Sequence, residues 1–270
     1  MKVSIILSTY NRPDALALIL QALSVQTYLN FEVIIADDGS GIETKELIYD
    51  LHRNLPYELH HLWQEDKGFR LAMARNKAVA KSSGDYLVFL DGDCVPRPNF
   101  IERHCQLAET HCFVTGNRIL LNEHFTTRIL FHQIPIGKWS NFAWILPFLH
   151  RDINRFLPLF SLPDGQFRIL NKPKWQGAKT CNLSVWKEDI LNINGFNEQF
   201  QGWGHEDAEF VVRLMHNSVK RKEGRFAVPA FHLWHSEADR SQEKLNRKRL
   251  EQCLQSTQIA VDLGVNQYLQ

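Results

Sequence analysis

Residues 71–94 read LAMARNKAVAKSSGDYLVFLDGDC and contain the two patterns that decide the fold. The first part, residues 71–83, is rich in alanine, the strongest helix former. The second part, residues 85–93, is an apolar run that predicts a buried strand, and it ends abruptly in Asp91, Gly92 and Asp93. A helix joined to a buried strand is the repeating unit of a parallel sheet.

The same alternation covers the preceding part of the chain. The expected strands span residues 3–8, 31–40 and 57–63, and the expected helices span residues 13–26 and 43–54. Such alternation predicts an α/β fold with a mostly parallel sheet and right-handed crossovers. Ligands of these sheets bind beyond the carboxyl ends of the strands. Because STYNR (residues 8–12), ADDGS (36–40) and DGDC (91–94) follow strands, we expect all three to converge on one edge.

The later part of the chain is less regular. Residues 98–110 predict a further helix, whereas residues 120–174 mix aromatic, proline and basic residues without strand periodicity. Residues 206–217 have the period of an amphipathic helix, and residues 241–261 predict a charged one. We therefore expect one domain over residues 1–270, made of a regular strand–helix half (1–118), an irregular insertion (119–175) and a last part with a C-terminal helix (176–270).

Composition excludes several classes of protein. The net charge is +1 and the sequence pI about 7.7, so we expect no nucleic-acid partner. Five cysteines without a C-x-x-C motif favour a reducing compartment over a disulfide framework. The longest apolar stretch, residues 142–149, is far shorter than the roughly 20 residues of a membrane-spanning helix. We expect a cytoplasmic protein, with a peripheral contact at the inner face of the membrane as a further hypothesis.

Asp91 and Asp93 are separated only by a glycine at the end of a buried run. Two neighbouring carboxylates repel each other and are costly to bury unless a cation lies between them. Mg²⁺ and Mn²⁺ bind carboxylate oxygens and keep positions for phosphate oxygens. The pair therefore predicts a divalent metal that bridges to a diphosphate. A turn capped by an aspartate is the alternative interpretation.

Asp37 and Asp38 end the strand of residues 31–40. A carboxylate only accepts hydrogen bonds, so one of them suits a nucleobase N–H or ribose hydroxyls. We expect the other to cap the helix that follows Gly39 and Ser40.

Basic residues cluster in DKGFRLAMARN, residues 66–76, close to the same edge. The forked donors of arginine suit phosphate, and pairing with surface acids is the alternative for Lys67, Arg70 and Arg75. Arg75 favours a functional role, because it lies next to Asn76 inside an otherwise apolar helix.

Five stretches occur in a fixed order: SIILSTYNR (4–12), VIIADDGS (33–40), DKGFRLAMARNKAVAKSSGDYLVFLDGDC (66–94), NLSVWKEDILNINGFNEQFQGWGHEDAEFVVRL (182–214) and FHLWH (231–235). With these motifs the chain resembles the family 2-like glycosyltransferases of the GT-A fold. The pattern is similar to the branch of bacterial chondroitin-type polymerase domains with a β-1,4-galactosyltransferase-like C-terminal motif. The resemblance covers most of the chain except residues 120–174.

The resemblance implies a Rossmann-like, mostly parallel mixed sheet flanked by helices, with an irregular or helical insertion on the acceptor side. It implies that residues 1–118 form the nucleotide-sugar-binding half and residues 176–270 the acceptor and catalytic half. Asp91 and Asp93 resemble the D-x-D motif that holds a metal on a nucleotide-sugar diphosphate. His235 matches a third metal ligand with His232 beside it, although His232 is equally interpreted as a buried, hydrogen-bonded residue. Imidazole ligands favour Mn²⁺ over Mg²⁺.

The GWGHED stretch, residues 202–207, resembles the catalytic motif. The family pattern implies Asp207 as the base and Glu206 as an acceptor contact, although some relatives align the other way. Carboxylates are also favoured at a helix start by the dipole alone. Trp203 resembles an aromatic platform for a sugar. His205 departs from the glycine common in this branch, which leaves the identity of the sugar open.

A single base opposite the leaving group implies an inverting transferase, and the family favours a UDP-sugar donor. The donor sugar stays open among galactose, glucose, glucuronate and N-acetylated hexosamines. The residues that the resemblance assigns to the donor are Tyr10, Arg12, Asp37, Asp38, Lys67, Arg70, Arg75 and Asp91.

Aromatic and basic residues in the insertion lead us to expect recognition of a glycan or glycolipid acceptor there, as in lipopolysaccharide or capsule synthesis. An aromatic insertion that packs into the core is the alternative. Two other functions are rivals of sugar transfer. A nucleotidyltransferase would not need GWGHED and usually has a glycine-rich stretch after the first strand, and a non-catalytic carbohydrate-binding module would not need Asp91, Asp93 and Asp207 together.

Overall fold

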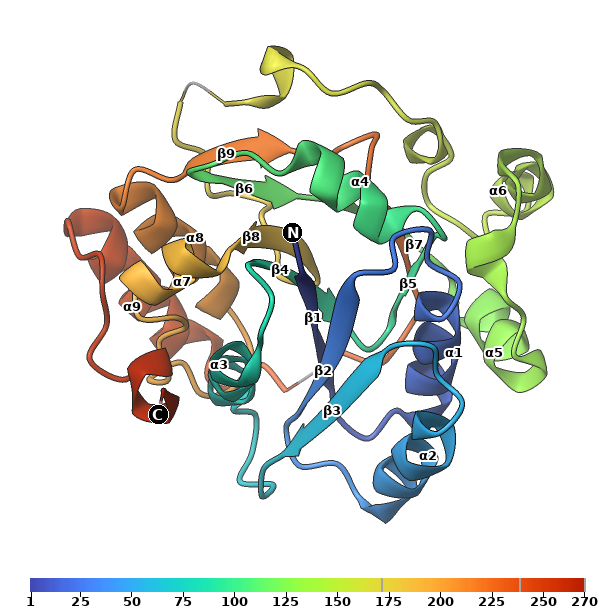
Figure 1. Ribbon diagram of the computed structural model, residues 1–270, viewed down its shortest axis with the longest axis horizontal. Helices are drawn as coiled ribbons and strands as arrows, with labels where there is room; N and C mark the ends of the chain where they lie inside the picture. Colours follow the sequence, from blue (N-terminus) through green and yellow to red (C-terminus); the bar gives the residue numbers. More distant parts are fainter. Residues whose placement is uncertain (171, 238, 270) are drawn as a thin grey trace.

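A computed structural model describes residues 1–170, 172–237 and 239–269. Its main sheet has seven strands (Figure 1). In spatial order they are β3 (Glu58–Trp63), β2 (Phe31–Asp37), β1 (Val3–Thr9), β4 (Tyr86–Asp91), β8 (Asn182–Trp186), β6 (Cys112–Thr115) and β9 (Lys220–Glu223).

The first four strands in this order are parallel, as the sequence pattern predicts. β1 pairs with β2 and with β4 in register, so that Thr9 lies beside Asp37 and Ser8 beside Asp91. The three polar stretches that follow β1, β2 and β4 therefore meet at one edge. β8 runs antiparallel to both β4 and β6, which makes the sheet mixed.

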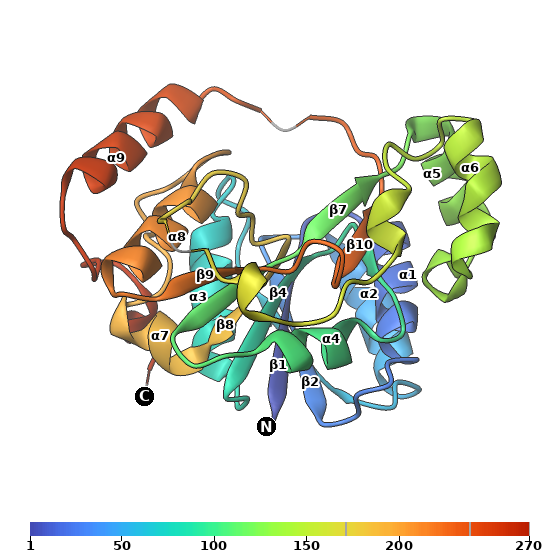
Figure 2. The ribbon, with the colours of Figure 1, turned by 90° about the horizontal axis from the view of Figure 1, so that it is seen from above.

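Helices cover both faces of the sheet (Figures 1 and 2). One apolar core joins the strands to α1 (Pro13–Leu23), α2 (Ile42–His52) and α4 (Phe100–Leu107), and the other joins them to α3 (Leu71–Lys81), α7 (Lys187–Asn192) and α8 (Glu206–His216). Alternate side chains of β1, such as Ile5 and Ile6, enter opposite cores, as the period of a strand requires. The expected α/β sandwich is confirmed.

A second, three-stranded sheet was not expected. β10 (Pro229–His232) pairs antiparallel with β5 (Cys94–Pro96) and parallel with β7 (Asn117–Leu120). His232 lies opposite Cys94 on one side and Leu120 on the other. This pairing carries the HLWH stretch to the turn formed by Asp91, Gly92 and Asp93.

The insertion contains short helices, chiefly α5 (Glu123–His132) and α6 (Ile145–Leu149). Trp144 is fully buried and stacks on Phe231 of β10, with ring centroids 4.1 Å apart. This tryptophan packs into the core, as the alternative interpretation of the insertion expects, whereas Phe142 and Phe148 are exposed.

The C-terminal helix α9 (Glu243–Gln255) is shorter than the predicted range of residues 241–261. Its residues Leu250 and Cys253 pack on Val212 of α8. Within residues 1–170, 172–237 and 239–269, no helix has both the length and the apolar character that crossing a bilayer requires.

Candidate active site

The turn after β4 is held tightly against β1. The Gly92 N–H donates to the carbonyl oxygen of Ser8 at 2.6 Å. A Cβ atom on Gly92 would lie 2.7 Å from the same oxygen, closer than real side chains approach a backbone atom. Only glycine therefore fits between the two acids without moving the turn.

Asp93 faces both histidines of the HLWH stretch. Its Oδ2 atom lies 3.2 Å from Nε2 of His235 and 3.5 Å from Nε2 of His232. On His235, Nδ1 lies 2.7 Å from the carbonyl oxygen of Ser236, which leaves Nε2 directed at Asp93. The structure thus brings together three of the residues predicted to bind metal.

The electrostatics of this cluster suit a cation. Burial would raise the pKa of Asp93, but the hydrogen bond from His235 and the neighbouring imidazoles bring it below its usual value. Burial lowers the pKa of His232 to about 4, so that this imidazole is neutral at pH 7. The hydrogen bond to Asp93 raises the pKa of His235, so a metal on its Nε2 atom would take the place of a proton. A carboxylate with two imidazoles is a donor set that Mn²⁺ accepts, and the residues present therefore fit a divalent metal.

Arg75 connects the metal-facing turn to the start of α8. Its side chain is 1% exposed, and its Nη2 atom donates to Asp91 at 3.0 Å while Nη1 donates to Asp207 at 3.1 Å. Glu206 lies 3.7 Å from Nη1. Carboxylates of the protein surround the Arg75 guanidinium. Its donors therefore face these acids, whereas a phosphate ligand would have donors open to the nucleotide.

The two acids at the start of α8 differ in environment. The Oδ1 atom of Asp207 accepts two hydrogen bonds, one from the Arg75 guanidinium and one from the Thr180 hydroxyl. Glu206 is more deeply buried. Burial and the adjacent Asp207 raise the pKa of Glu206 to about 7, in spite of Arg75. Burial, opposed by Arg75 and reinforced by Asp93, also raises the pKa of Asp91 to about 6.

Asp37 and Asp38 are buried and bonded to the protein. Asp37 accepts from the Ser40 backbone N–H at 2.8 Å and lies 2.8 Å from Nε2 of His61. Asp38 accepts from Gln64 at 2.6 Å and from the Arg70 backbone N–H at 2.7 Å. The expectation that one of them caps α2 is wrong: the N-cap is Gly41, whose N–H donates to Asn11 instead.

The other residues assigned to the donor line the rim of the same edge. The Tyr10 hydroxyl donates to Asp66 at 2.9 Å, and the side chain is half exposed. Arg12 pairs with Asp14 at 3.2 Å. Lys67 likewise pairs with Glu65 at 2.7 Å. The Arg70 side chain folds back onto the Glu65 carbonyl.

Trp203 lies between two glycines in the left-handed region, and the Gly202 N–H donates to the Phe69 carbonyl oxygen at 2.9 Å. The Arg240 guanidinium stacks 4.7 Å from the centre of the indole ring. Gly202 and Gly204 have φ of 74° and 109°, and His205, with φ of 72°, continues this strained turn into α8. The ring Nε2 of His205 is buried without a partner among the described residues.

Three residues of the site escaped sequence reasoning. Thr180 contacts Asp207, Arg240 covers Trp203, and Arg118 of β7 lies half-buried close to Asp91. None of them stands in a motif with a characteristic spacing. The only available signal was a polar residue close to a strand end, as with Thr180 before β8.

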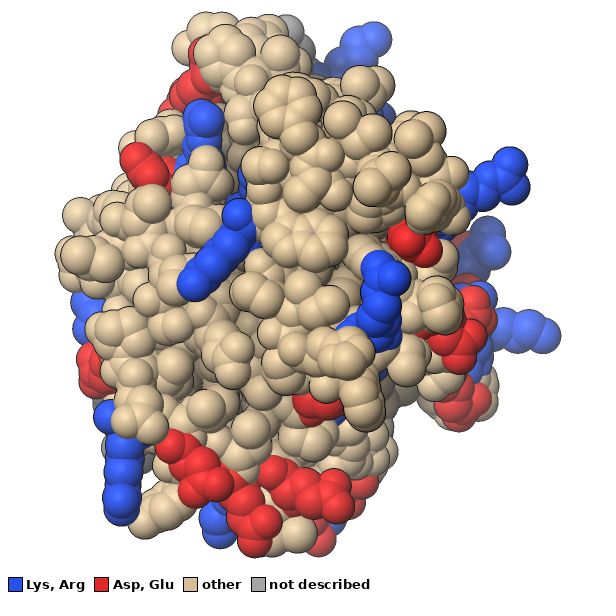
Figure 3. Space-filling model, turned by 90° about the vertical axis from the view of Figure 1, so that its right-hand side faces the viewer, with Lys and Arg blue, Asp and Glu red and all other residues tan. Residues whose placement is uncertain are grey.

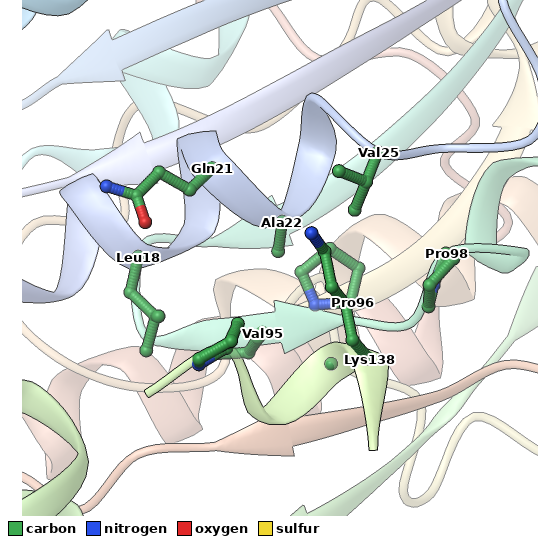
Figure 4. Close-up of a pocket in the computed structure, with 10 residues that line it drawn as sticks. Leu18, Gln21, Ala22, Val25, Val95, Pro96, Pro98 and Lys138 are labelled. Atoms are coloured by element: carbon green, nitrogen blue, oxygen red, sulfur yellow. The ribbon is translucent and has the colours of Figure 1, made fainter. Parts of the chain in front are cut away.

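A separate hollow of about 70 Å³ lies between α1 and β5 (Figure 4). Its walls are mostly apolar, with Leu18, Val25, Val95 and Pro96 among them. The acids and histidines described above do not line it, so we do not assign it to the active site.

Comparison with protein families gives two matches along the chain. The model for "Glycosyl transferase family 2" matches residues 4–172. The model described as "N-terminal domain of galactosyltransferase" matches residues 170–236, which include the GWGHED and HLWH stretches.

Curated relatives carry the names of sugar transferases. The chain is 28% identical over 263 residues to validoxylamine A glucosyltransferase of Streptomyces hygroscopicus subsp. jinggangensis, which covers 91% of this chain and 59% of the relative. It is 27% identical over 221 residues to chondroitin synthase of Escherichia coli, which covers 78% of this chain and 32% of the relative. The chain thus spans less than two thirds of the length of these relatives.

Solved structures share the fold. The S. aureus TarS 1–349 complex with UDP-GlcNAc has a TM-score of 0.64 at 16% identity, covering 100% of this chain and 70% of that one. The mannosyltransferase PcManGT from Pyrobaculum calidifontis, in complex with GDP-Man and Mn²⁺, has a TM-score of 0.62 at 14% identity, covering 94% and 64%.

Proposed function

The chain belongs to glycosyl transferase family 2, and we propose that it is an inverting, metal-dependent enzyme that transfers a hexose or N-acetylhexosamine from a UDP-sugar to a glycan acceptor. The main support for this proposal is that two acidic pairs lie close together at one edge of the sheet. These pairs are Asp91 with Asp93 and Glu206 with Asp207. Arg75 joins Asp91, which lies 16 residues along the chain from it, to Asp207, which lies 132 residues away. The acids that we propose to bind the metal and to accept the proton thereby lie close to one another.

Asp93, His235 and Asp91 would hold the metal, with His232 beside them. We propose Mn²⁺, with Mg²⁺ as the alternative, because imidazole belongs to the ligand set. The PcManGT complex with Mn²⁺ supports this choice for the fold. When bound, such an ion stabilises the negative charge of a departing diphosphate.

Asp207 is our proposed general base. Arg75 and Thr180 fix its Oδ1 atom, so that Oδ2 remains for the hydroxyl of the acceptor. Removal of that proton as the oxygen attacks the anomeric carbon displaces the nucleotide directly and inverts the configuration. Glu206 is proposed to contact the acceptor, and Trp203 to cover the sugar and exclude water.

The donor is proposed to lie along the edge formed by β1, β2 and β4, within residues 1–118. Tyr10, Arg12, Lys67 and Arg70 line this edge and offer donors to a nucleotide, while Asp37 and Asp38 shape its floor. UDP is supported by the TarS complex with UDP-GlcNAc, although the fold also accommodates GDP-Man in PcManGT.

The acceptor is proposed to be a glycan or glycolipid of bacterial surface polysaccharide or lipopolysaccharide synthesis. Names such as chondroitin synthase and hyaluronan synthase among the relatives support a polysaccharide. Residues 119–175 and 176–270 would bind it. A cytoplasmic enzyme at the inner face of the membrane would meet such acceptors where they are built.

A donor-hydrolysis assay tests the proposal. The protein is incubated with Mn²⁺ and a panel of UDP-galactose, UDP-glucose, UDP-glucuronate, UDP-GlcNAc, UDP-GalNAc and GDP-mannose, and release of the nucleotide is measured. We expect release from at least one UDP-sugar, its loss on addition of EDTA, and none from GDP-mannose. Release that persists in EDTA, or from GDP-mannose alone, would contradict the proposal.

A further inference from the structure

The insertion displays large apolar side chains to solvent. We define the α5–α6 face as the exposed side chains of residues 128–160. Its apolar members include Phe131, Phe142, Leu146, Phe148, Leu149 and Leu157. Phe131 and Phe142 are 81% and 79% exposed, which is unusual for phenylalanine.

Buried residues attach this face to the core of the protein. Pro147 of α6 is buried, while its neighbours Leu146 and Phe148 point outward. Beneath them the fully buried Trp144 stacks on Phe231 of the second sheet. A well-packed element that still turns most of its large apolar side chains outward indicates a surface that binds a partner.

The charges on the face have one sign. Residues 128–160 contain four basic residues, Arg128, Lys138, Arg151 and Arg155, and a single acid, Asp152, whereas the whole chain is balanced at 31 basic to 30 acidic residues. All four basic residues are exposed, and Asp152 is half-buried and accepts from the Asn122 amide at 3.1 Å. Figure 3 shows this side of the molecule as a broad uncharged area with isolated basic side chains, and most of the acidic ones lie along its lower and right-hand edges.

The face adjoins the active site. Leu120 pairs with His232 of the proposed metal site, and the same leucine lines a hollow of about 610 Å³ together with Phe148, Leu149 and Arg151. In Figure 2, α5 and α6 lie on the side of the molecule toward which β1 and β4 run. A flat partner seated on the face would therefore lie next to the opening of the site.

We propose that the α5–α6 face docks on an anionic lipid bilayer, with its apolar side chains inserted among the lipids and its basic residues against the headgroup phosphates. Exposed apolar side chains ringed by Lys and Arg are the combination that an interfacial segment requires. The inference deepens the proposed function, since it names a lipid surface as the place where the acceptor is met. Docking needs neither donor nor acceptor, so it is tested separately from transfer.

The test is co-sedimentation with vesicles of phosphatidylcholine alone and of phosphatidylcholine with 30 mol% phosphatidylglycerol, a composition chosen to be roughly as anionic as a bacterial inner face. We expect at least a tenfold higher bound fraction with the anionic vesicles, and weaker binding in 0.5 M salt, by roughly fivefold for each basic residue engaged. The double variant Arg151→Ser/Arg155→Ser should lower anionic binding by roughly tenfold or more.

Insertion is tested by the triple variant Phe142→Ser/Leu146→Ser/Leu149→Ser. Its matched control is Leu29→Ser/Ile42→Ser/Tyr49→Ser, which removes three exposed apolar side chains elsewhere on the surface. The first should lose vesicle binding and the second should keep it, with circular dichroism confirming that both are folded. No binding of the unchanged protein to either vesicle, or equal binding of the two triple variants, would overturn the proposal. So would a dimer in light scattering that the face variant alone dissociates, since the face would then bind a second copy.

Discussion

The guanidinium of Arg75 faces Asp91, Glu206 and Asp207 in surroundings almost closed to water. Replacing it in Arg75→Met would keep the volume but leave three carboxylates without their cation. We expect unfolding in urea to show a loss of about 3 to 5 kcal/mol. The control Arg12→Met removes a rim arginine whose one ion pair among the described residues is with Asp14, and it should change stability by less than about 0.5 kcal/mol. Equal effects of the two variants would show that the buried network does not hold the acids.

Asp207 and Glu206 can be separated by two isosteric changes. Asp207→Asn keeps the acceptor for Arg75 and Thr180 but removes the base, so kcat should fall by about 10²- to 10⁴-fold. Glu206→Gln should chiefly raise KM for the acceptor. UDP affinity, measured by calorimetry with Mn²⁺, should stay unchanged in both. The reverse pattern, with kcat lost in Glu206→Gln, would reassign the base to Glu206.

Burial is the main cause that raises the pKa of Glu206 to about 7, and from this shift we predict how stability depends on pH. A carboxyl group whose pKa is higher in the folded than in the unfolded state destabilises the protein as pH rises above its ordinary value of 4.5 toward 7. Glu206→Gln should therefore stabilise the metal-free protein at pH 8 by on the order of 2 kcal/mol and have little effect at pH 4.5. Thermal unfolding at the two pH values in EDTA measures this. A gain of the same size at both would contradict the role of the charge.

Single residues also mark the limit of prediction from sequence. The sequence pattern of Asp91 and Asp93 after a buried strand predicts a metal, and the resemblance to the family adds His235 as a ligand. The sequence does not reveal that Arg75 contacts Asp207, because that contact joins residues 132 positions apart and depends on the apolar core that α3 and α8 share. Thr180 was missed for the same reason.

The turn between β4 and β5 is positioned by its contact with β1. Gly92→Ala would place a methyl group 2.7 Å from the Ser8 carbonyl, which is backbone and cannot rotate away. We expect the turn to shift, and kcat/KM to fall by roughly 10²-fold as Asp91 and Asp93 move. Gly41→Ala is the control, since its Cβ would meet only Asn11 Oδ1 at 3.7 Å. Activity assays that show equal effects would mean that the close approach at Gly92 does not matter.

Among the elements, those with long, regular patterns were predicted well. β1, β2 and β4 are fully or almost fully buried, so their apolar runs are continuous and easy to recognise. β5, β9 and β10 have only three or four residues each, and β9 reads Lys-Arg-Lys-Glu. The position of such short strands is determined by their partner strands and not by a local sequence pattern. For this reason neither β9 of the main sheet nor the second sheet was predicted.

At the scale of the whole molecule, the parallel half of the sheet follows from strand–helix alternation, whereas the antiparallel β8 and the docking of β10 on β5 depend on contacts distant in sequence. Those distant contacts bring the GWGHED stretch at the start of α8, and His232 and His235 at and just after the end of β10, to the D-x-D turn. The order of motifs along the chain predicts that they cooperate, and only the folded chain shows how.

In our proposal, Asp91, Asp93 and His235 would hold a divalent ion on the diphosphate of the donor. Its most direct test is a crystal of the protein grown with Mn²⁺ and UDP, with diffraction recorded at the manganese absorption edge. We expect one strong anomalous peak at about 2.0–2.3 Å from an oxygen of Asp93 and from Nε2 of His235, and in contact with the phosphates of UDP. UDP bound elsewhere, or at this edge with no peak between these side chains, would contradict it.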